Sequence, residues 1–338
     1  MEKSNKGVFI SVLMSVYNEE EEWIRMAIDS ILSQTYSNFE FIIVNDNPIR
    51  FLNSKILCEY QNKDNRIIVL HNEDNLGLPK SLNKALGISR GEFVARMDAD
   101  DYSFPNRLEV QIDFFRNNPD IIACGTFANV FIDDKIIDQI KLPIDMPDIY
   151  FQSFTSVVAV HPTLMIWKNK LLEFNIKYDE SFILSQDYKL ELDILQYGKI
   201  KNIPRVLLNY RNSLSEKNKN HLTYSNYYGN MNRRIAIDRF YNKYEIEKLP
   251  QNISLKNIKD NYEYETGIIS NIKMNRDELY LFKISMNCIR RVLYMSLDEY
   301  SFRSVFLYLS SLDYIYKPYN FKRFVAVIMK PFLKINLI

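Results

Sequence analysis

Two patterns of apolar positions alternate along the first hundred residues. Short apolar runs rich in β-branched residues recur, and between them apolar residues return every three or four positions. The runs are typical of buried strands, and the three-and-four spacing is typical of amphipathic helices. The predicted strands cover 9–16, 39–44, 66–70 and 93–97, while the predicted helices cover 51–60 and 79–88 and also begin near 19–22 and at Pro105.

These alternating strands and helices predict the architecture of the N-terminal half. Strands that are apolar on both faces favour a parallel sheet covered by helices. We therefore expect an α/β fold with a Rossmann-like, mixed and mostly parallel sheet flanked by helices. Ligands of such sheets bind beyond the carboxyl ends of the strands. Polar peptides at 17–19, 45–47 and 98–101 follow three predicted strands, so they should line one edge of the sheet.

From about residue 120 the pattern changes. Apolar runs on either side of a polar turn predict an antiparallel hairpin, and a polar run is typical of a linker. Beyond the linker, apolar residues again step by three and four, which predicts helices. The predicted elements are a hairpin at 121–131 and 136–140, an apolar stretch at 157–166, a helix at 186–197, a strand near 206–210 and a linker at 215–221. We therefore expect one domain over 1–215 and a helical C-terminal region over 216–338.

Charge balance and cysteine content exclude several classes of protein. The chain has 338 residues, a formal net charge of +1, and three scattered cysteines and three scattered histidines. Balanced charge gives no global reason to expect nucleic-acid binding, and no zinc-ligand spacing occurs. The first twenty residues lack the order of a signal peptide, and no apolar run approaches the roughly 18 residues that span a bilayer. Together with sparse cysteines, these features predict a cytoplasmic protein.

The last segment, 318–338, mixes lysine and arginine with apolar residues, and no acidic residue follows Asp313. One interpretation is a basic amphipathic tail that lies on an anionic membrane surface. The other is a terminal helix that packs on the body of the protein and turns its lysines to solvent. On the first interpretation the protein would be peripheral at the inner face of the cell membrane.

The stretch RMDADD concentrates negative charge. Asp98, Asp100 and Asp101 lie within four residues, directly after a predicted strand. Like charges this close repel, and each carboxylate loses hydration where it is buried. A divalent cation would remove that cost, because Mn²⁺ and Mg²⁺ prefer oxygen ligands, and it would neutralise a phosphate leaving group. The alternative is a solvated acidic turn, since aspartate is common in turns.

The motifs SVYNEE, VNDNP, RMDADD, HPTLM, SQDY and NYR follow one another in an order that resembles family 2 glycosyltransferases over roughly residues 8–215. The resemblance implies a GT-A fold, a nucleotide-sugar donor and inversion at the anomeric carbon. It also implies a Mn²⁺ or Mg²⁺ cofactor. A donor carrying UDP and a hydroxyl acceptor on a growing, lipid-linked glycan of a bacterial surface polysaccharide fit this resemblance.

The resemblance also implies roles for individual residues. Asp187 matches the catalytic base, which would take the proton of the acceptor hydroxyl. Its alternative is a residue that stabilises a helix N-terminus. Asp98 and Asp100 match the metal-binding pair, and His161 matches an acceptor-side position. The expected donor-binding residues are Val16, Tyr17, Glu19, Asp46, Arg96, Asp98, Ala99, Asp101 and Arg211.

Two of these residues have a specific chemical expectation. Asp46 would recognise the nucleotide base, because a carboxylate can accept the imide N–H of uracil. Arg211 would clamp the diphosphate, although a surface arginine after a strand is the competing interpretation. For His161, a histidine that fixes a turn before proline is an equally simple explanation.

Several positions depart from the family pattern. Asn45 replaces the first acid of a common Asp pair, and Gln186 replaces a glutamate that often precedes the base. Ser213 stands where many members have a histidine, so water or another group would take over any metal contact there.

Two other functions compete with glycosyl transfer. A sugar nucleotidyltransferase shares the general architecture, but it would be expected to carry a glycine-rich phosphate loop after the first strand, where SVYNEE has no glycine. A non-catalytic glycan-binding or nucleotide-sugar-binding module would not need both the acidic pair and Asp187. We therefore expect an inverting, metal-dependent enzyme that transfers one sugar.

Overall fold

A computed structural model of the chain describes residues 7–132, 135–212 and 219–243. The chain divides after Arg234 into two units, Met1–Arg234 and Ile235–Ile338. The sheet and the site described below lie in the first unit. The tail at 318–338, the helices expected after 243 and Ser213 lie outside the described residues. The expected division into 1–215 and 216–338 stays a prediction.

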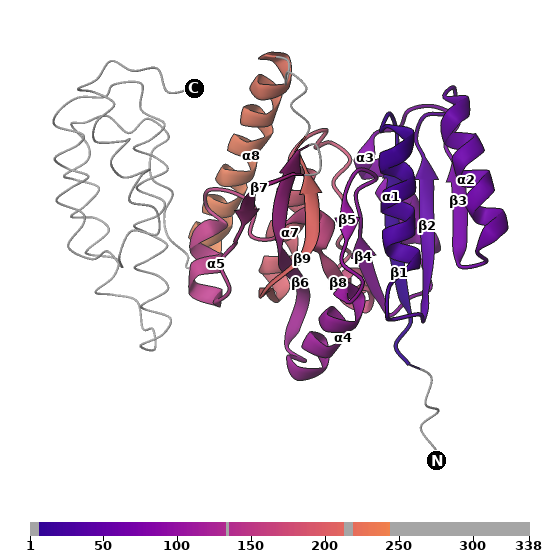
Figure 1. Ribbon diagram of the computed structural model, residues 1–338. Helices are drawn as coiled ribbons and strands as arrows, with labels where there is room; N and C mark the ends of the chain where they lie inside the picture. Colours follow the sequence, from indigo (N-terminus) through magenta and orange to yellow (C-terminus); the bar gives the residue numbers. More distant parts are fainter. Residues whose placement is uncertain (1–6, 133–134, 213–218, 244–338) are drawn as a thin grey trace, which may run out of the picture. The chain divides into compact units, whose positions relative to one another are not determined.

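The first hundred residues form the alternation that their pattern predicts (Figure 1). The elements are β1 (Ile10–Val16), α1 (Glu21–Leu32), β2 (Phe39–Asn45), α2 (Phe51–Lys63), β3 (Ile67–His71), α3 (Leu78–Ile88) and β4 (Phe93–Arg96). Strand β1 pairs in parallel with β2 and β4, and β2 pairs in parallel with β3. Every residue of β1, β2 and β4 is buried, which explains why these strands read as continuous apolar runs.

The remaining elements complete a mixed sheet. They are β5 (Tyr102–Ser103), α4 (Arg107–Asn117), β6 (Ile121–Ile132), β7 (Lys135–Ile140), α5 (Met146–Gln152), a 3₁₀ turn η1 (His161–Thr163), β8 (Met165–Trp167), α6 (Lys168–Glu173), α7 (Gln186–Tyr197), β9 (Lys199–Arg211) and α8 (Lys219–Lys243). The strand order is β3-β2-β1-β4-β8-β6-β9-β5, with β7 on β6. β8 runs antiparallel to both neighbours, whereas β6 and β9 are parallel. The expected α/β sheet and the β6–β7 hairpin are confirmed.

Several expected boundaries were wrong for local physical reasons. Helix α4 begins at Arg107 rather than at Pro105, because 104–106 forms a turn closed by the Arg107 N–H on the Phe104 carbonyl. Strand β9 begins well before 206, since Pro204 is accommodated where the β6–β9 register shifts. The stretch 157–166 divides into a loop, η1 and part of β8. Lys219–His221 of the expected linker open α8, because a polar run also suits a solvated helix.

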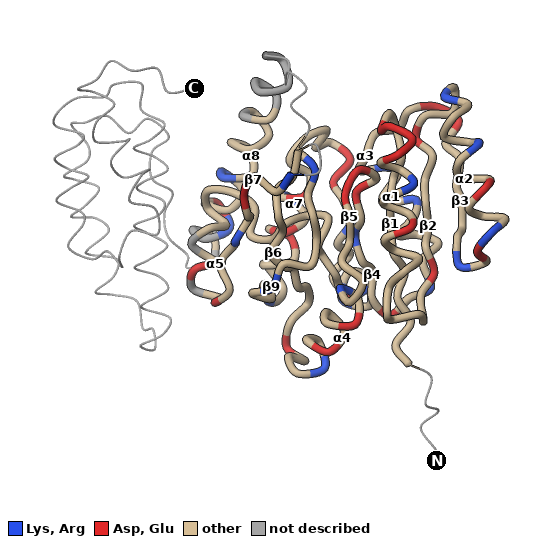
Figure 2. Tube along the Cα trace, in the orientation of Figure 1, with Lys and Arg blue, Asp and Glu red and all other residues tan. Residues whose placement is uncertain are grey.

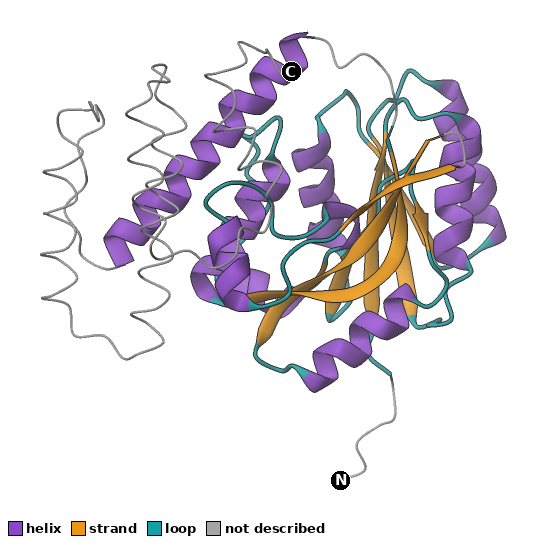
Figure 3. Cartoon of the chain, turned by 60° about the vertical axis from the view of Figure 1, so that its left-hand side comes forward, coloured by secondary structure: helices purple, strands orange, loops and turns teal. Residues whose placement is uncertain are grey.

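The core lies on both faces of the sheet. Successive residues of a strand point to opposite faces, so Val12 and Met14 join one apolar cluster and Leu13 joins the other. Helix α1 buries Ile24, Ala27, Ile28 and Ile31 in the first cluster. Helices flank the sheet in Figure 3. Within the described residues, no helix has the length and apolar character needed to cross a bilayer.

The parallel strands place the polar peptides at one edge, as expected. Val16 at the end of β1 is paired with Asn45 at the end of β2, and Asp46 N–H bonds the Val16 carbonyl at 2.9 Å. Strand β4 ends at Arg96 opposite Leu13. The peptides 17–19, 45–47 and 98–101 therefore leave the sheet on the same side. Acidic positions gather above these strand ends near β5 (Figure 2).

Candidate active site

The acidic turn after β4 holds carboxylates in two different environments. Asp98 and Asp100 are partly exposed, whereas Asp101 is fully buried. Burial, together with the negative charges of Asp98 and Glu19, raises the pKa of Asp100 to about 7. Burial also raises the pKa of Glu19, and the negative charge of Asp98 contributes to the same shift. The charge of Glu19, in the loop after β1, therefore interacts with the carboxylates of the turn.

This donor set fits a hard divalent cation. Its accessible members, Glu19, Asp98 and Asp100, offer only carboxylate oxygens, and their mutual repulsion is the feature that a cation relieves. No group of three or more His, Cys, Asp or Glu side chains is arranged to hold a metal within the residues that the structure describes. Mn²⁺ or Mg²⁺ would therefore rely on phosphate oxygens and water for most of its ligands, as Mg²⁺ commonly does.

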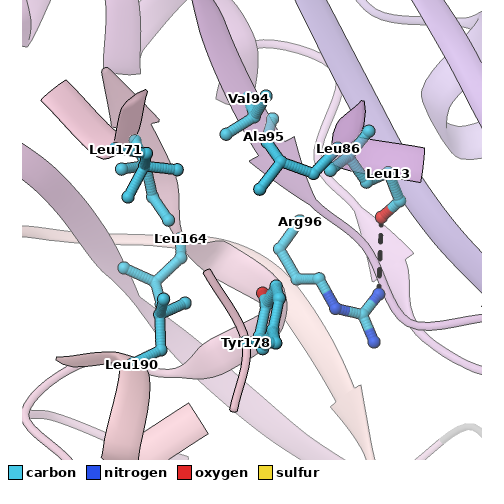
Figure 4. Close-up of a pocket in the computed structure, with 10 residues that line it drawn as sticks. Leu13, Leu86, Val94, Ala95, Arg96, Leu164, Leu171, Tyr178 and Leu190 are labelled. Carbon is cyan, nitrogen blue, oxygen red and sulfur yellow. Dashed lines mark hydrogen bonds between the residues drawn. The ribbon is translucent and has the colours of Figure 1, made fainter. Parts of the chain in front are cut away.

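Arg96 orients the first carboxylate of the turn. It is buried at the end of β4, its Nη2 donates to Asp98 Oδ1, and its Nη1 reaches the Leu13 carbonyl at 3.4 Å. Figure 4 shows Arg96 beside Tyr178 in a small pocket whose other walls are apolar, among them Leu164 and Leu190. The buried guanidinium thus orients the Asp98 carboxylate. Its expected contact with a donor stays a prediction.

Arg211 at the end of β9 is held against the same turn. Its backbone N–H donates to Asp101 Oδ1 at 2.8 Å, and its Nε donates to the Asp100 carbonyl at 2.9 Å. The guanidinium carbon lies 4.6 Å from the Trp23 ring centroid and 4.3 Å from that of Phe131. These contacts fix the backbone that presents Asp100. The diphosphate clamp expected for Arg211 stays a prediction.

Asp46 closes a loop at the neighbouring strand end. Its Oδ1 accepts hydrogen bonds from Asn72 Nδ2 at 2.7 Å and the Leu76 N–H at 2.8 Å, and its Oδ2 accepts the Gly77 N–H at 3.0 Å. Gly77 has φ of +83°, which favours glycine at this turn. A carboxylate has about four acceptor positions, so Oδ2 retains capacity for a ligand. Base recognition by Asp46 stays a prediction.

The loop after β1 combines an exposed aromatic ring with an internal hydrogen bond. Tyr17 is 42% exposed, and its N–H donates to Glu19 Oε2 at 2.7 Å. Val16 and Ala99 are buried. Contact of these four residues with a donor stays a prediction, and Tyr17 offers the most surface for it.

Asp187 lies in the first turn of α7, as predicted. Its Oδ1 accepts the Tyr188 N–H at 2.8 Å, while Ser185 before the helix makes no side-chain cap bond. Burial raises the pKa of Asp187, the Tyr188 N–H lowers it, and the charge of Asp98 raises it. The structure therefore brings α7 within electrostatic reach of the acidic turn. The hydrogen bond within the first turn also keeps the helix-stabilising interpretation open.

Tyr210 precedes Arg211 at the end of β9 and is half-buried. Burial raises the pKa of its phenol, and the charges of Asp98, Asp101, Asp100 and then Asp187 add to this effect. Carboxylates of both the turn and α7 therefore act on this phenol.

His161 is enclosed rather than open to solvent. Its Nε2 shares a 2.9 Å hydrogen bond with the Tyr178 hydroxyl, and burial holds the pKa of His161 well below its usual range. The imidazole is therefore neutral near pH 7. An acceptor contact by His161 stays a prediction, and its place at the start of η1 before Pro162 also suits the turn-fixing role.

Glu191 was not predicted from the sequence, and it holds the backbone of the segment that precedes His161. Glu191 is fully buried one helical turn after Asp187, and its carboxylate accepts the N–H groups of Val158 at 2.6 Å and Ala159 at 3.1 Å. A glutamate at i+4 from the expected base was a usable signal, since it shares that face of the helix.

Comparison with known proteins finds glycosyltransferases. Residues 11–179 match the family described as Glycosyl transferase family 2. An uncharacterised glycosyltransferase of Methanocaldococcus jannaschii is 41% identical over 206 residues, which cover 60% of this chain and 70% of that protein. An uncharacterised glycosyltransferase of Haemophilus influenzae is 28% identical over 97% of this chain and 98% of its own. The O-antigen biosynthesis glycosyltransferase WbnJ of Escherichia coli is 35% identical over 64% of this chain and 84% of its own.

Solved structures show the same fold. TarS 1–349 of S. aureus in complex with UDP has a TM-score of 0.54 and 18% identity, with 85% of this chain and 82% of that chain covered. The UDP-GlcNAc complex of the same protein has a TM-score of 0.53 and 17% identity, over 90% of this chain and 79% of that one. At this identity the likeness concerns the fold alone, and it confirms the GT-A-like arrangement.

Proposed function

This chain belongs to glycosyl transferase family 2, and on that premise we propose that it transfers one sugar from a nucleoside diphosphate to a hydroxyl group, with inversion at the anomeric carbon. The observation that carries the proposal is the place of the polar peptides 17–19, 45–47 and 98–101 at the carboxyl edge of the sheet, together with Asp187 in the first turn of α7, on which the charge of Asp98 acts. On this proposal the acidic turn would face the donor and Asp187 would be the base.

The chemistry assigned to this chain's residues is a single displacement. The Asp187 carboxylate takes the proton of the acceptor hydroxyl while the oxygen forms its bond to the anomeric carbon. The bond between that carbon and the diphosphate oxygen breaks, and the electron pair leaves with the diphosphate. A bound Mn²⁺ or Mg²⁺ would neutralise the charge of the leaving group, which is why no second acid is needed. Glu19, Asp98 and Asp100 would hold that ion and the donor.

A UDP-sugar is the donor that the observations favour. TarS 1–349, which shares this fold, forms complexes with UDP and with UDP-GlcNAc. The free acceptor capacity of Asp46 Oδ2 suits an imide N–H, which uracil has and cytosine lacks. UDP should therefore compete with the donor better than CDP does. Equal inhibition by the two nucleotides would argue against Asp46 as the residue that recognises the nucleotide base.

Relatives suggest the acceptor class. WbnJ of Escherichia coli is named for O-antigen biosynthesis, and AmsE of Erwinia amylovora is named for amylovoran biosynthesis. We therefore place this enzyme in polysaccharide biosynthesis, acting on a growing glycan that is lipid-linked. The lysines of 318–338 would hold it at an anionic membrane surface.

Deleting 318–338 should move the enzyme from the membrane fraction to the soluble fraction while sugar transfer to a water-soluble acceptor continues. The physical reason is the loss of basic and apolar contacts with the membrane surface. Fractionation of cells that express the full and the shortened chain measures this. An unchanged distribution would mean that the tail packs on the protein instead.

A screen for UDP release tests the proposed function directly. The purified chain is incubated with individual UDP-sugars and Mn²⁺, with and without hydroxyl acceptors, and UDP is measured. We expect Mn²⁺-dependent release of UDP that rises when an acceptor is present. Release of pyrophosphate from a nucleoside triphosphate and a sugar phosphate would instead support a nucleotidyltransferase. Binding of UDP-sugar without turnover on any acceptor would support a binding module.

A further inference from the structure

The turn before α7 contains a strained residue. Ser185 has φ of +56° and ψ of +27°, a left-handed conformation that residues with a side chain seldom adopt. Within the residues that the structure describes, the one other non-glycine residue with positive φ is Asn175, and asparagine tolerates that conformation better. A strained residue persists where its surroundings hold it, and such residues gather at functional sites. Ser185 stands two positions before Asp187.

The carbonyl oxygen of Ser185 is held by two donors. It accepts the Lys189 N–H of α7 at 3.2 Å, which is a backbone hydrogen bond of the first helical turn. It also accepts Nδ2 of Asn232, a residue of α8, at 2.9 Å. The Ser185 side chain makes no cap bond. The strained residue is therefore fixed through its carbonyl, and this one atom joins the start of α7 to α8.

Asn232 is a polar side chain in a fully enclosed position. It has no exposed surface, and its Oδ1 has no hydrogen-bond partner in the part of the chain that the structure describes. An amide that is only partly hydrogen-bonded is costly to bury, and a leucine of similar size would fill the space without that cost. The bond from Nδ2 to Ser185 gives a reason for asparagine at this position.

Two further contacts join α8 to the same region. Tyr228 lies one helical turn before Asn232, and its ring centroid is 5.6 Å from that of Phe182, a buried residue of the loop before α7. On α8, Arg233 Nε donates to the carbonyl of Thr155 in the segment after α5 at 2.9 Å. Helix α8 thus holds the loop before α7 at two places and the segment after α5 at a third.

We propose that Asn232 is a positioning residue for sugar transfer, because by holding the Ser185 carbonyl it fixes the first turn of α7 and the Asp187 carboxylate on it. The inference rests on the proposed function, since it takes Asp187 as the base. It goes beyond that function by adding α8 to the active site, although this helix lies outside the residues 11–179 that match the family. A catalytic group displaced by about 1 Å can lose a factor of about 100 in rate.

Replacing Asn232 with leucine tests the proposal, because leucine has a similar volume and cannot donate to Ser185. We expect kcat to fall by about 10- to 100-fold, while the Kd for UDP with Mn²⁺ stays within about twofold of the wild type, since the base acts in the transition state only. Asn242→Leu, at an exposed asparagine of the same helix, is the matched control and should keep the wild-type rate. Where Asn232→Leu does not yield folded protein, Asn232→Ala takes its place.

The same substitution in the Asp187→Asn background separates positioning of the base from a general loss of structure. If Asn232 acts through Asp187, the double variant should have a kcat within about twofold of that of Asp187→Asn alone. An equal fold-loss from Asn232→Leu in both backgrounds would overturn the proposal, and so would a wild-type kcat in folded Asn232→Leu. Parallel losses of kcat, UDP affinity and melting midpoint would also overturn it, because Asn232 would then support the fold alone.

Amide hydrogen exchange of Lys189, followed by NMR, examines the contact without an assay of transfer. Its N–H bonds the carbonyl that Asn232 holds, so it should exchange faster in Asn232→Leu than in the wild type. Unchanged protection would overturn the positioning of this turn whether or not the wild type is active. Absence of sugar transfer by the wild type would instead reject the proposed function.

Discussion

Replacing Asp187 with asparagine is expected to lower kcat for sugar transfer by about 10²–10⁴-fold, the usual contribution of a general base. The amide keeps the size of the side chain and its acceptor oxygen for the Tyr188 N–H, but it cannot take a proton. Donor affinity should stay within about twofold of the wild type, because the loss concerns the transition state only. Steady-state rates with saturating donor, together with UDP binding by calorimetry, measure the two quantities separately.

The pH profile of the wild type adds a second readout for Asp187. The Asp187 carboxylate must be ionised to accept a proton, and burial raises its pKa. We therefore expect kcat to fall as the pH is lowered, with a midpoint above the ordinary pKa range of aspartate. Asp193→Asn on the same helix is the matched control, since Asp193 pairs with Lys189 instead. If Asp187→Asn folds normally and retains the wild-type rate, Asp187 is a helix-stabilising residue and the base lies elsewhere.

The sequence predicted the elements of the sheet best where one period continued long enough to be read. Helix α7 was predicted with the bounds that the structure has, and β1 to β4 were found within one or two residues at their ends. Strands β5 and β8 were missed because two or three residues carry no periodicity. Their pairing with β9 and β4 comes from tertiary contacts, which a local pattern does not contain.

The sequence also placed the candidate chemistry at one edge, because parallel strands end together. It did not reveal which side chains turn inward. Asp101 and Arg96 stand in the same hexapeptide as Asp98, yet both are buried. Arg107 gave no signal beyond an ordinary charged position in a helix, and Glu191 gave only its i+4 spacing from Asp187, because both side chains act on backbone groups far away in the sequence.

Asp100→Asn is expected to remove the response of the protein to Mn²⁺. In the metal-free protein, burial and the charges of Asp98 and Glu19 raise the pKa of Asp100 to about 7, compared with 3.8 for the free side chain. A cation must displace that proton, so Mn²⁺ affinity should fall by up to about tenfold for each pH unit below 7. The asparagine variant should lose both the affinity and its pH dependence, and turnover should fall with them.

The same shift in pKa predicts the sign of a stability effect. Because the folded-state pKa of Asp100 lies above the unfolded one, the folded protein binds more protons between about pH 4 and pH 7. This group therefore makes the metal-free protein less stable as pH rises through that window. Asp100→Asn should raise the melting midpoint of the metal-free protein at pH 8 and change it little at pH 4.

Mn²⁺ should reverse that ranking at pH 8. A ligand that binds only the folded protein stabilises it by about 2.7 kcal/mol at a hundred times its Kd, so the wild type should gain a higher melting midpoint from Mn²⁺ while Asp100→Asn gains none. Melts at pH 6 and pH 8, with EDTA or Mn²⁺, measure this, and Asp113→Asn on the exposed face of α4 is the control. An equal Mn²⁺ shift in the wild type and in Asp100→Asn would remove Asp100 from the metal site, because the ion would then be held without it.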